Sequence, residues 1–139
     1  MSWTLDGAFE SGTALVADLP LSQVRFQLDR RFPWLILVPR REAVSEIEEL
    51  WPTDRHQLMD EIVRCGEAVH AIGRAWDRPV LKLNVGALGN ITRQLHVHVV
   101  GRREDDLAWP GPVWGHGTAF PPGADARRKA ISAAKRLLG

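Results

Sequence analysis

The sequence is poor in cysteine, in net charge and in long apolar runs, and each shortage argues against a class of protein or partner. Its one cysteine, Cys65, cannot form a disulfide within the chain. The opening residues, Met-Ser-Trp-Thr-Leu-Asp-Gly-Ala-Phe-Glu, lack the basic and apolar regions of a secretory signal. We therefore expect a protein of the reducing cytoplasm.

Neither a membrane nor a nucleic acid is indicated as a partner. No apolar run approaches the roughly 18 residues needed to cross a bilayer. A formal net charge of +1 provides no basic excess for nucleic acid or for a membrane surface. Any anionic ligand must therefore be held by local groups.

The length and composition are those of one globular domain. The chain has 139 residues, 45% of them hydrophobic and 25% charged. A chain of this size buries about two-thirds of the surface that its unfolded form exposes, so its core needs no disulfide, metal or cofactor. We expect a single domain over residues 1–139, with a segment rich in tryptophan and proline and a basic helix within 104–139.

Short runs rich in Val, Leu, Ile and Phe predict three strands in the first part of the chain. They cover residues 13–17, 23–28 and 34–38 and are separated by turn signals that contain Asp and Pro. Apolar and polar residues alternate in the second run, which indicates one buried face. The third run is apolar throughout, as is typical of a central strand.

Helical spacing of apolar residues predicts two helices in the middle of the chain. The first covers residues 42–50 and is expected to end before Pro52. Thr53 is the expected N-cap of a long second helix, in which apolar residues recur every three or four positions as far as Trp76. The turn at 77–79 closes it.

Two further strands and a last helix complete the predicted order. Residues 80–83 and 94–100 read as strands joined by the glycine-containing loop 84–90. A helical pattern resumes over 124–138 after an irregular stretch. This order of elements predicts an α+β fold built on an antiparallel sheet.

The run Gln-Leu-His-Val-His-Val-Val at 94–100 is the candidate site. Alternate side chains on a strand share a face, so Gln94, His96 and His98 point one way and the apolar residues between them point into the core. Two adjacent imidazoles repel each other if both are charged, so such a pair usually ligates a metal or contacts an anion. The spacing alone leaves both interpretations open.

This run resembles the signature of the histidine triad (HIT) family, which is His-x-His-x-His and two apolar residues after a glycine-containing loop. The resemblance covers residues 24–102 and includes the turn at 84–86 and the strand end at 38–41. Gln94 stands at the first histidine position, as in a bacterial subgroup of the family. The resemblance implies a HIT-like α+β fold with about five antiparallel strands, one long helix, one or two shorter helices, and a homodimer.

The resemblance also implies chemistry on the phosphate of a small nucleotide. The family's middle histidine attacks the α-phosphorus and water then resolves the nucleotidyl-histidine, which makes His96 the nucleophile and leaves His98 to contact phosphate oxygens. A neutral imidazole can attack near neutral pH, with its other nitrogen oriented by a backbone carbonyl. We expect metal-independent hydrolysis or nucleotidyl transfer on dinucleoside polyphosphates, nucleoside phosphoramidates or similar conjugates.

The substrate contacts implied by the resemblance lie in the glycine-containing loop and after the second strand. Backbone N–H groups of residues 86–90, which include Gly89, and the side chains of Asn84 and Asn90 are expected to donate to phosphate oxygens. Asp29 is expected to hold the ribose hydroxyls.

The departure at Gln94 bears on catalysis. A carboxamide can donate a hydrogen bond to a leaving-group oxygen but cannot transfer a proton to it, and losing a positioned acid costs about 10²- to 10⁴-fold. His116 is the candidate to replace that acid. In the tail, Trp109 or Trp114 would stack on a base if this segment folds over the site.

Two alternatives stay open at this stage. Gln94 favours a nucleotide-binding module with little or no catalysis. The histidine count favours a zinc-binding structural protein, whose further ligands would come from His56, His70, His116 and Cys65. Cys65, however, falls on the apolar side of the long helix and is expected to be buried.

Overall fold

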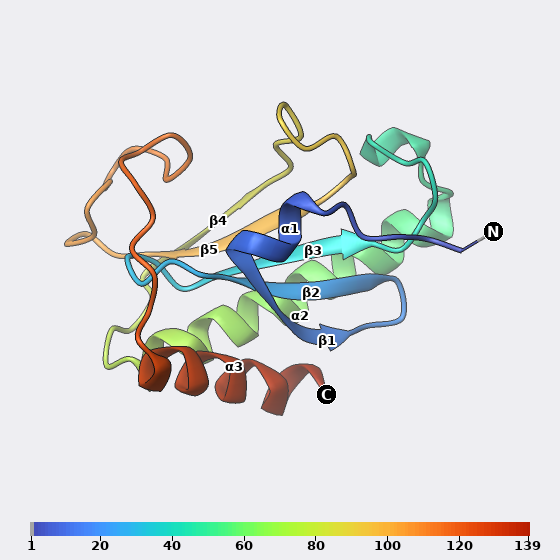
Figure 1. Ribbon diagram of the computed structural model, residues 1–139. Coiled ribbons are helices and arrows are strands. Elements are labelled where there is room, and N and C mark those ends of the chain that lie inside the picture. The colour runs from blue at the N-terminus through green and yellow to red at the C-terminus, as the bar shows by residue number, and fades with distance from the viewer. Residues whose placement is uncertain (1) are drawn as a thin grey trace.

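The computed structural model describes residues 2–139. Five strands form one antiparallel sheet in the order β1-β2-β3-β5-β4, so β3 is central and β1 and β4 are the edges (Figure 1). The strands are β1 (Thr13–Asp18), β2 (Ser22–Gln27), β3 (Trp34–Pro39), β4 (Lys82–Gly86) and β5 (Val97–Arg102).

Two helices cover one face of this sheet, and a short helix lies over the other (Figure 1). The first two are α2 (Pro52–Ala75) and α3 (Ala124–Leu138), which spans the predicted residues, and the third is α1 (Ala8–Gly12). One long and two shorter helices on a five-stranded antiparallel sheet confirm the predicted α+β fold. Within residues 2–139, no helix is both long and apolar enough to cross a membrane.

Apolar clusters bury β3 on both faces, as its uninterrupted apolar sequence predicts. On the helix side, Leu35 and Leu37 join a cluster with Val69 of α2. On the other side, Trp34 and Ile36 join a second cluster with α1 and with the segment that follows β5. The face opposite α2 and α3 is therefore covered by the N-terminal segment and by the segment between β5 and α3.

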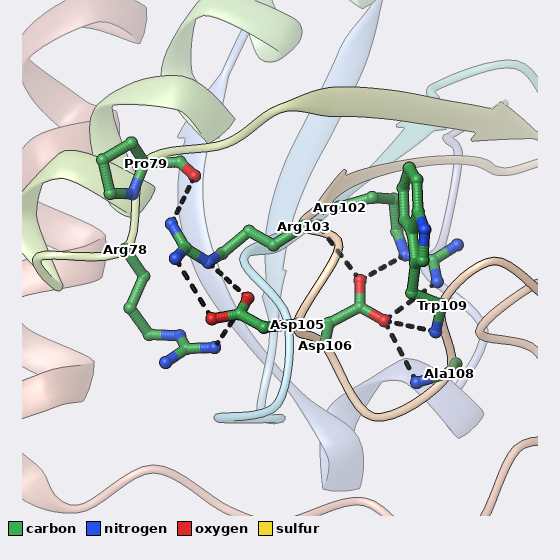
Figure 2. Close-up of polar contacts among 8 residues, drawn as sticks. All are labelled: Arg78, Pro79, Arg102, Arg103, Asp105, Asp106, Ala108 and Trp109. Atoms are coloured by element: carbon green, nitrogen blue, oxygen red, sulfur yellow. Dashed lines mark hydrogen bonds and ion pairs between the residues drawn. The ribbon is translucent and has the colours of Figure 1, made fainter.

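The segment after β5 turns back through a buried ion pair between Arg102 and Asp106 (Figure 2). Arg102 Nε donates to Asp106 Oδ2 over 2.8 Å. The same carboxylate accepts the backbone N–H groups of Arg103, Ala108 and Trp109. One carboxylate thus sets the path of this turn toward the second apolar cluster.

The predicted helix over 42–50 is wrong in extent, because only η1 (Ile47–Glu49) forms, as a 3₁₀ turn. Ala43 has a φ of 58°, in the left-handed region, which a continuous α-helix cannot include. The Glu49 carboxylate instead accepts the N–H groups of Ser45 and Glu46.

The predicted N-cap of the long helix is also wrong. The N-cap is Trp51 and the first helical residue is Pro52, so the helix begins before Thr53. Proline is favoured there because its φ is already helical and it has no N–H to leave unpaired. Pro52 therefore begins α2, whereas the sequence pattern suggested that it only ended the preceding helix.

The last two strands are shifted from the predicted ranges 80–83 and 94–100. β4 extends further along the chain, so Asn84 lies on a strand and not in a loop. β5 begins later because the N–H of Leu95 donates to the carbonyl of Val44, outside the sheet. The candidate motif therefore straddles the start of β5.

Glu61 of α2 is fully buried and holds the turn between β1 and β2. Its carboxylate accepts the N–H groups of Leu21 and Ser22, over 2.8 and 2.9 Å, and the side-chain amide of Gln57. A buried carboxylate is tolerated when such donors satisfy it. The helical pattern of the sequence gives no sign of this role.

Replacing Glu61 by alanine is expected to lower the free energy of unfolding by about 3 kcal/mol, because two buried N–H groups lose their acceptor. Glu61→Gln should cost at least about 1 kcal/mol, since its NH₂ group would face an N–H donor. The measurement is urea unfolding followed by tryptophan fluorescence. Glu67→Ala, at an exposed position of the same helix, should stay within about 0.5 kcal/mol of the parent. Equal effects of Glu61→Ala and Glu67→Ala would contradict the assignment.

Candidate active site

The two motif histidines lie side by side on the sheet face opposite α2. Leu95, Val97 and Val99 point into the main core, as predicted, so the alternation of side chains turns His96 and His98 to the other face. Their ring centroids are 4.9 Å apart. Both are largely buried, at 5% and 8% exposure.

His96 is held in one tautomer by the backbone. Its Nδ1 lies 2.7 Å from the carbonyl oxygen of Gln94, which can only accept, so Nδ1 carries the proton. In the neutral ring this leaves the Nε2 lone pair free. The ring of Phe9, in α1, meets the His96 ring edge-on with centroids 4.9 Å apart.

His98 is held in the opposite tautomer by an indole. Trp34 Nε1 donates to His98 Nδ1 over 3.0 Å, and because an indole N–H can only donate, the His98 proton must sit on Nε2. Burial, and then the nearby His96, lowers the pKa of His98 to about 4. His98 is therefore a neutral donor near neutral pH.

Both histidines line a cavity of about 440 Å³, within the range of small-molecule sites. Its walls come from the end of β2 and the following turn, from the loop after β4, and from the tail at 113–119. The predicted residues that it brings together are Asp29, Asn90, His96 and His98. Trp114 and His116 of the tail also line it, whereas Trp109 does not.

Three predicted site residues do not line this cavity: Asn84, Gly89 and Gln94. Asn84 pairs with Val100 on the histidine face, and its Oδ1 accepts from Arg102 Nη1 over 2.7 Å. The Gln94 carboxamide bonds to the N-terminal segment, with Oε1 accepting from Asp6 N–H.

Asp29 lines the cavity but is only 1% exposed. It forms an ion pair with Arg31, whose Nη2 lies 2.8 Å from Oδ2, and this hydrogen bond raises the pKa of Arg31. Asp29 Oδ1 also accepts the N–H of Phe120, and Arg31 Nη1 donates to the carbonyl of His116. Together these contacts fasten the tail beside the cavity.

Trp114 completes the wall beside His98. The two ring centroids are 5.6 Å apart, and the indole lies over Gly86, where an added Cβ would come within 3.2 Å of Trp114 Cη2. Gly86 pairs with His98 in the sheet, so a side chain there would displace the wall of the site. The sequence alone does not place this tryptophan, because its position depends on how the tail folds.

Trp34 and Phe9 are contacts of the histidines that sequence reasoning missed. Alternation along β3 offered a signal for Trp34, because Trp34 pairs with Val100 and shares the histidine face. No comparable signal exists for Phe9, which lies far from the motif in the sequence.

Within the described residues, the histidine pair has no further ligands placed to hold a metal. Among residues 2–139, no three His, Cys, Asp or Glu side chains are grouped closely enough to do so. Burial, and then the nearby Glu61 carboxylate, raises the pKa of the Cys65 thiol to about 12. Cys65 is fully buried in the main core, on the sheet face opposite the histidines. The zinc-binding alternative therefore finds no ligand set in this part of the chain.

Comparison with known proteins gives the family. The HIT domain model matches residues 8–105. A histidine triad protein of Bradyrhizobium japonicum is 40% identical, with a TM-score of 0.93 and each chain covered in full. One from Sinorhizobium meliloti is 43% identical, with a TM-score of 0.88 over 98% of this chain and 97% of that one. One from Marinobacter aquaeolei is 31% identical, with a TM-score of 0.89 over 99% and 97%.

Among the curated proteins, none matches the chain significantly. The matched residues 8–105 contain the sheet, α2 and the motif that carries His96 and His98. The likeness to the Bradyrhizobium structure extends over the whole chain, including the tail that walls the cavity. The chain belongs to the histidine triad (HIT domain) family.

Proposed function

We propose that this chain is a nucleotide-phosphate hydrolase or nucleotidyl transferase that works through a nucleotidyl-histidine on His96. The observation that carries the proposal is the 2.7 Å contact of His96 Nδ1 with the Gln94 carbonyl. It leaves the Nε2 lone pair as the nucleophile of a residue that lines a cavity of ligand size. The substrates are dinucleoside polyphosphates, nucleoside phosphoramidates or similar conjugates.

The proposed reaction has two displacements at the same phosphorus. His96 Nε2 attacks the α-phosphorus, a P–N bond forms, and the bond to the leaving group breaks with its electron pair on that group. Water then attacks the phosphorus and gives a proton to solvent, and the P–N bond breaks with its electron pair on Nε2, which releases the nucleoside monophosphate and leaves His96 as a neutral imidazole. An alcohol or amine in place of water gives transfer.

In this scheme two neutral groups donate hydrogen bonds to the phosphate, and a third group gives a proton to the leaving group. His98 Nε2–H donates to a non-bridging oxygen, because its Nδ1 is occupied by Trp34. Asn90, in the loop after β4, lines the same cavity and adds a side-chain donor. His116 lines the cavity from the tail and supplies the proton to the leaving group. The tail thus belongs to the same functional domain as the sheet.

We also propose that the protein forms a homodimer through β4. This strand is a sheet edge with an unpaired backbone within the described chain. Val85 on β4 is 50% exposed, and Met59 and Val63 of α2 are similarly exposed. They lie on one side of the sheet: a Cβ added at Gly66, one turn after Val63, would lie 2.9 Å from Leu83 Cδ1, and Leu83 shares a strand face with Val85. Edge strands flanked by apolar side chains are sites of chain pairing.

Intact-mass measurement should detect a nucleotidyl adduct on the wild-type chain after brief exposure to a diadenosine polyphosphate or a nucleoside phosphoramidate, quenched without acid because P–N bonds are acid-labile. His96→Ala should show neither adduct nor product. His56→Ala, which changes an exposed histidine of α2, should behave as wild type. Binding of several donors without adduct or product would favour a nucleotide-binding module without catalysis.

Trp34→Phe is expected to let the His98 proton occupy either Nδ1 or Nε2, because an aromatic ring remains at position 34 but the N–H donor to Nδ1 is lost. Imidazole ¹⁵N signals should show the proton on Nε2 in wild type between about pH 5.5 and 8, above the pKa of about 4, and a mixture of tautomers in the variant. The affinity for a nucleoside monophosphate should fall with it.

Trp114→Phe is the matched control for this variant. Its ring lies as close to His98 as that of Trp34, at 5.6 Å, but its buried Nε1 has no hydrogen-bond partner among residues 2–139. The His98 tautomer should therefore be unchanged in Trp114→Phe. A single Nε2–H tautomer in Trp34→Phe would refute the assigned role of the indole.

Light scattering coupled to size exclusion should give the mass of two chains for wild type and of one chain for Val85→Lys, because a charge at the paired edge cannot be buried. Leu15→Lys is the matched control, since Leu15 is 49% exposed on the opposite edge strand. It should remain dimeric. A monomeric wild type, or dissociation caused equally by both variants, would exclude the β4 interface.

A further inference from the structure

The Gln94 side chain forms two hydrogen bonds with the backbone of the N-terminal segment. Its Oε1 accepts the N–H of Asp6 over 2.8 Å, and its Nε2 donates to the carbonyl of Thr4 over 2.9 Å. In an extended segment, the carbonyl of one residue and the N–H of the residue two further on point to the same edge. A carboxamide offers one acceptor and two donors side by side, so it pairs with this edge as a neighbouring strand would.

This pairing holds the segment against the histidine face. Trp3 and Leu5, on either side of Thr4, pack against the second apolar cluster. Phe9, a few residues further on, is 6% exposed in that cluster and places its ring edge-on to His96, with centroids 4.9 Å apart. The carboxamide is thus fastened to the segment whose next buried side chain touches the proposed nucleophile.

Gln94 therefore constrains His96 from two sides. Its backbone carbonyl accepts the Nδ1 proton, and its side chain holds the segment that carries Phe9. Gln94 itself does not line the cavity. An imidazole, whose donor and acceptor point in diverging directions, cannot pair with one backbone edge in the same way.

We propose that Gln94 is a positioning residue whose carboxamide clasps the extended N-terminal segment and thereby seats Phe9 on His96, in place of any action on the leaving group. The effect on turnover rests on the proposed function, whereas the clasp itself does not. The first position of the motif thus orients His96 in this chain, and the N-terminal segment supports His96 through Phe9 from outside the cavity.

A double-mutant cycle in the full chain separates this role from direct catalysis. Gln94→Ala and Phe9→Ala should each lower kcat by up to about 100-fold with little change in KM, because the nucleophile is misplaced while the cavity is intact. The double variant should be no slower than the slower single variant, because both changes remove the same support. Multiplying effects would show that Gln94 acts on the substrate and would overturn the proposal.

Conservative variants sharpen the test. Gln94→Glu keeps the acceptor for the Asp6 N–H and should retain more activity than Gln94→Ala. Gln94→His restores the family's motif and should nevertheless be slower than wild type. Thr4→Ala should leave kcat unchanged, because Gln94 contacts only the backbone there. A faster Gln94→His enzyme would mean that the first position serves proton transfer.

Amide hydrogen exchange tests the two Gln94 hydrogen bonds without an activity measurement. Gln94→Ala should raise the exchange rate of the Asp6 amide and shift the ring-proton resonances of His96, as the Phe9 ring current is lost, while the amides of β5 stay protected. Unchanged Asp6 exchange would overturn the clasp even in an active enzyme. If Gln94→Ala loses Asp6 protection but the wild type forms no adduct with any donor, the proposed function is refuted and the hydrogen bonding of Gln94 to the N-terminal segment is still supported.

Discussion

The alternation of side chains around the start of β5 is the constraint on which the site depends. Because successive side chains of a strand point to opposite faces, seating Leu95, Val97 and Val99 under α2 turns His96 and His98 to the other face. A slip of one residue would exchange the two sets, so burial of the apolar residues fixes the register of the histidines. The geometry of the proposed nucleophile is thus fixed by the same hydrophobic packing that stabilises the fold.

The histidine face is closed by segments that are distant in sequence, and polar side chains fasten each of them. Gln94 holds the N-terminal segment, Asp29 with Arg31 holds the tail, and Asp106 sets the turn that leads into it. Each contact pairs a buried or half-buried side chain with backbone N–H groups. Such groups must be satisfied once water is excluded, so the cover of the site is specified by hydrogen bonds as much as by apolar contact.

Local patterns predicted what is local. Some features are visible within short windows of sequence: the alternation along the strands, the apolar run of β3 and the helical spacing in α2 and α3. The fold class that they predict is confirmed. One error falls where a distant contact decides, because the backbone bond of Leu95 to Val44 delays β5. Two others are local, since the positive φ of Ala43 breaks the first predicted helix and Pro52 begins α2. The motif led to the histidines, but their contacts with Phe9 and Trp114 depend on how the N-terminal segment and the segment between β5 and α3 fold back, which no local pattern encodes.

The electrostatics of the two histidines must be considered together. In the proposed reaction, neutral His96 Nε2 bonds to phosphorus and its ring becomes cationic, so the contact of Nδ1–H with the Gln94 carbonyl would strengthen as that charge develops. A charged His98 beside it would oppose this step, whereas the low pKa of His98 keeps it neutral. Arg31, the one Arg or Lys among the described residues lining the cavity, is already paired with Asp29. In the proposed reaction, the phosphate beside the two histidines therefore meets oriented N–H dipoles in place of an unpaired Arg or Lys, and the positive charge that develops during attack appears on His96.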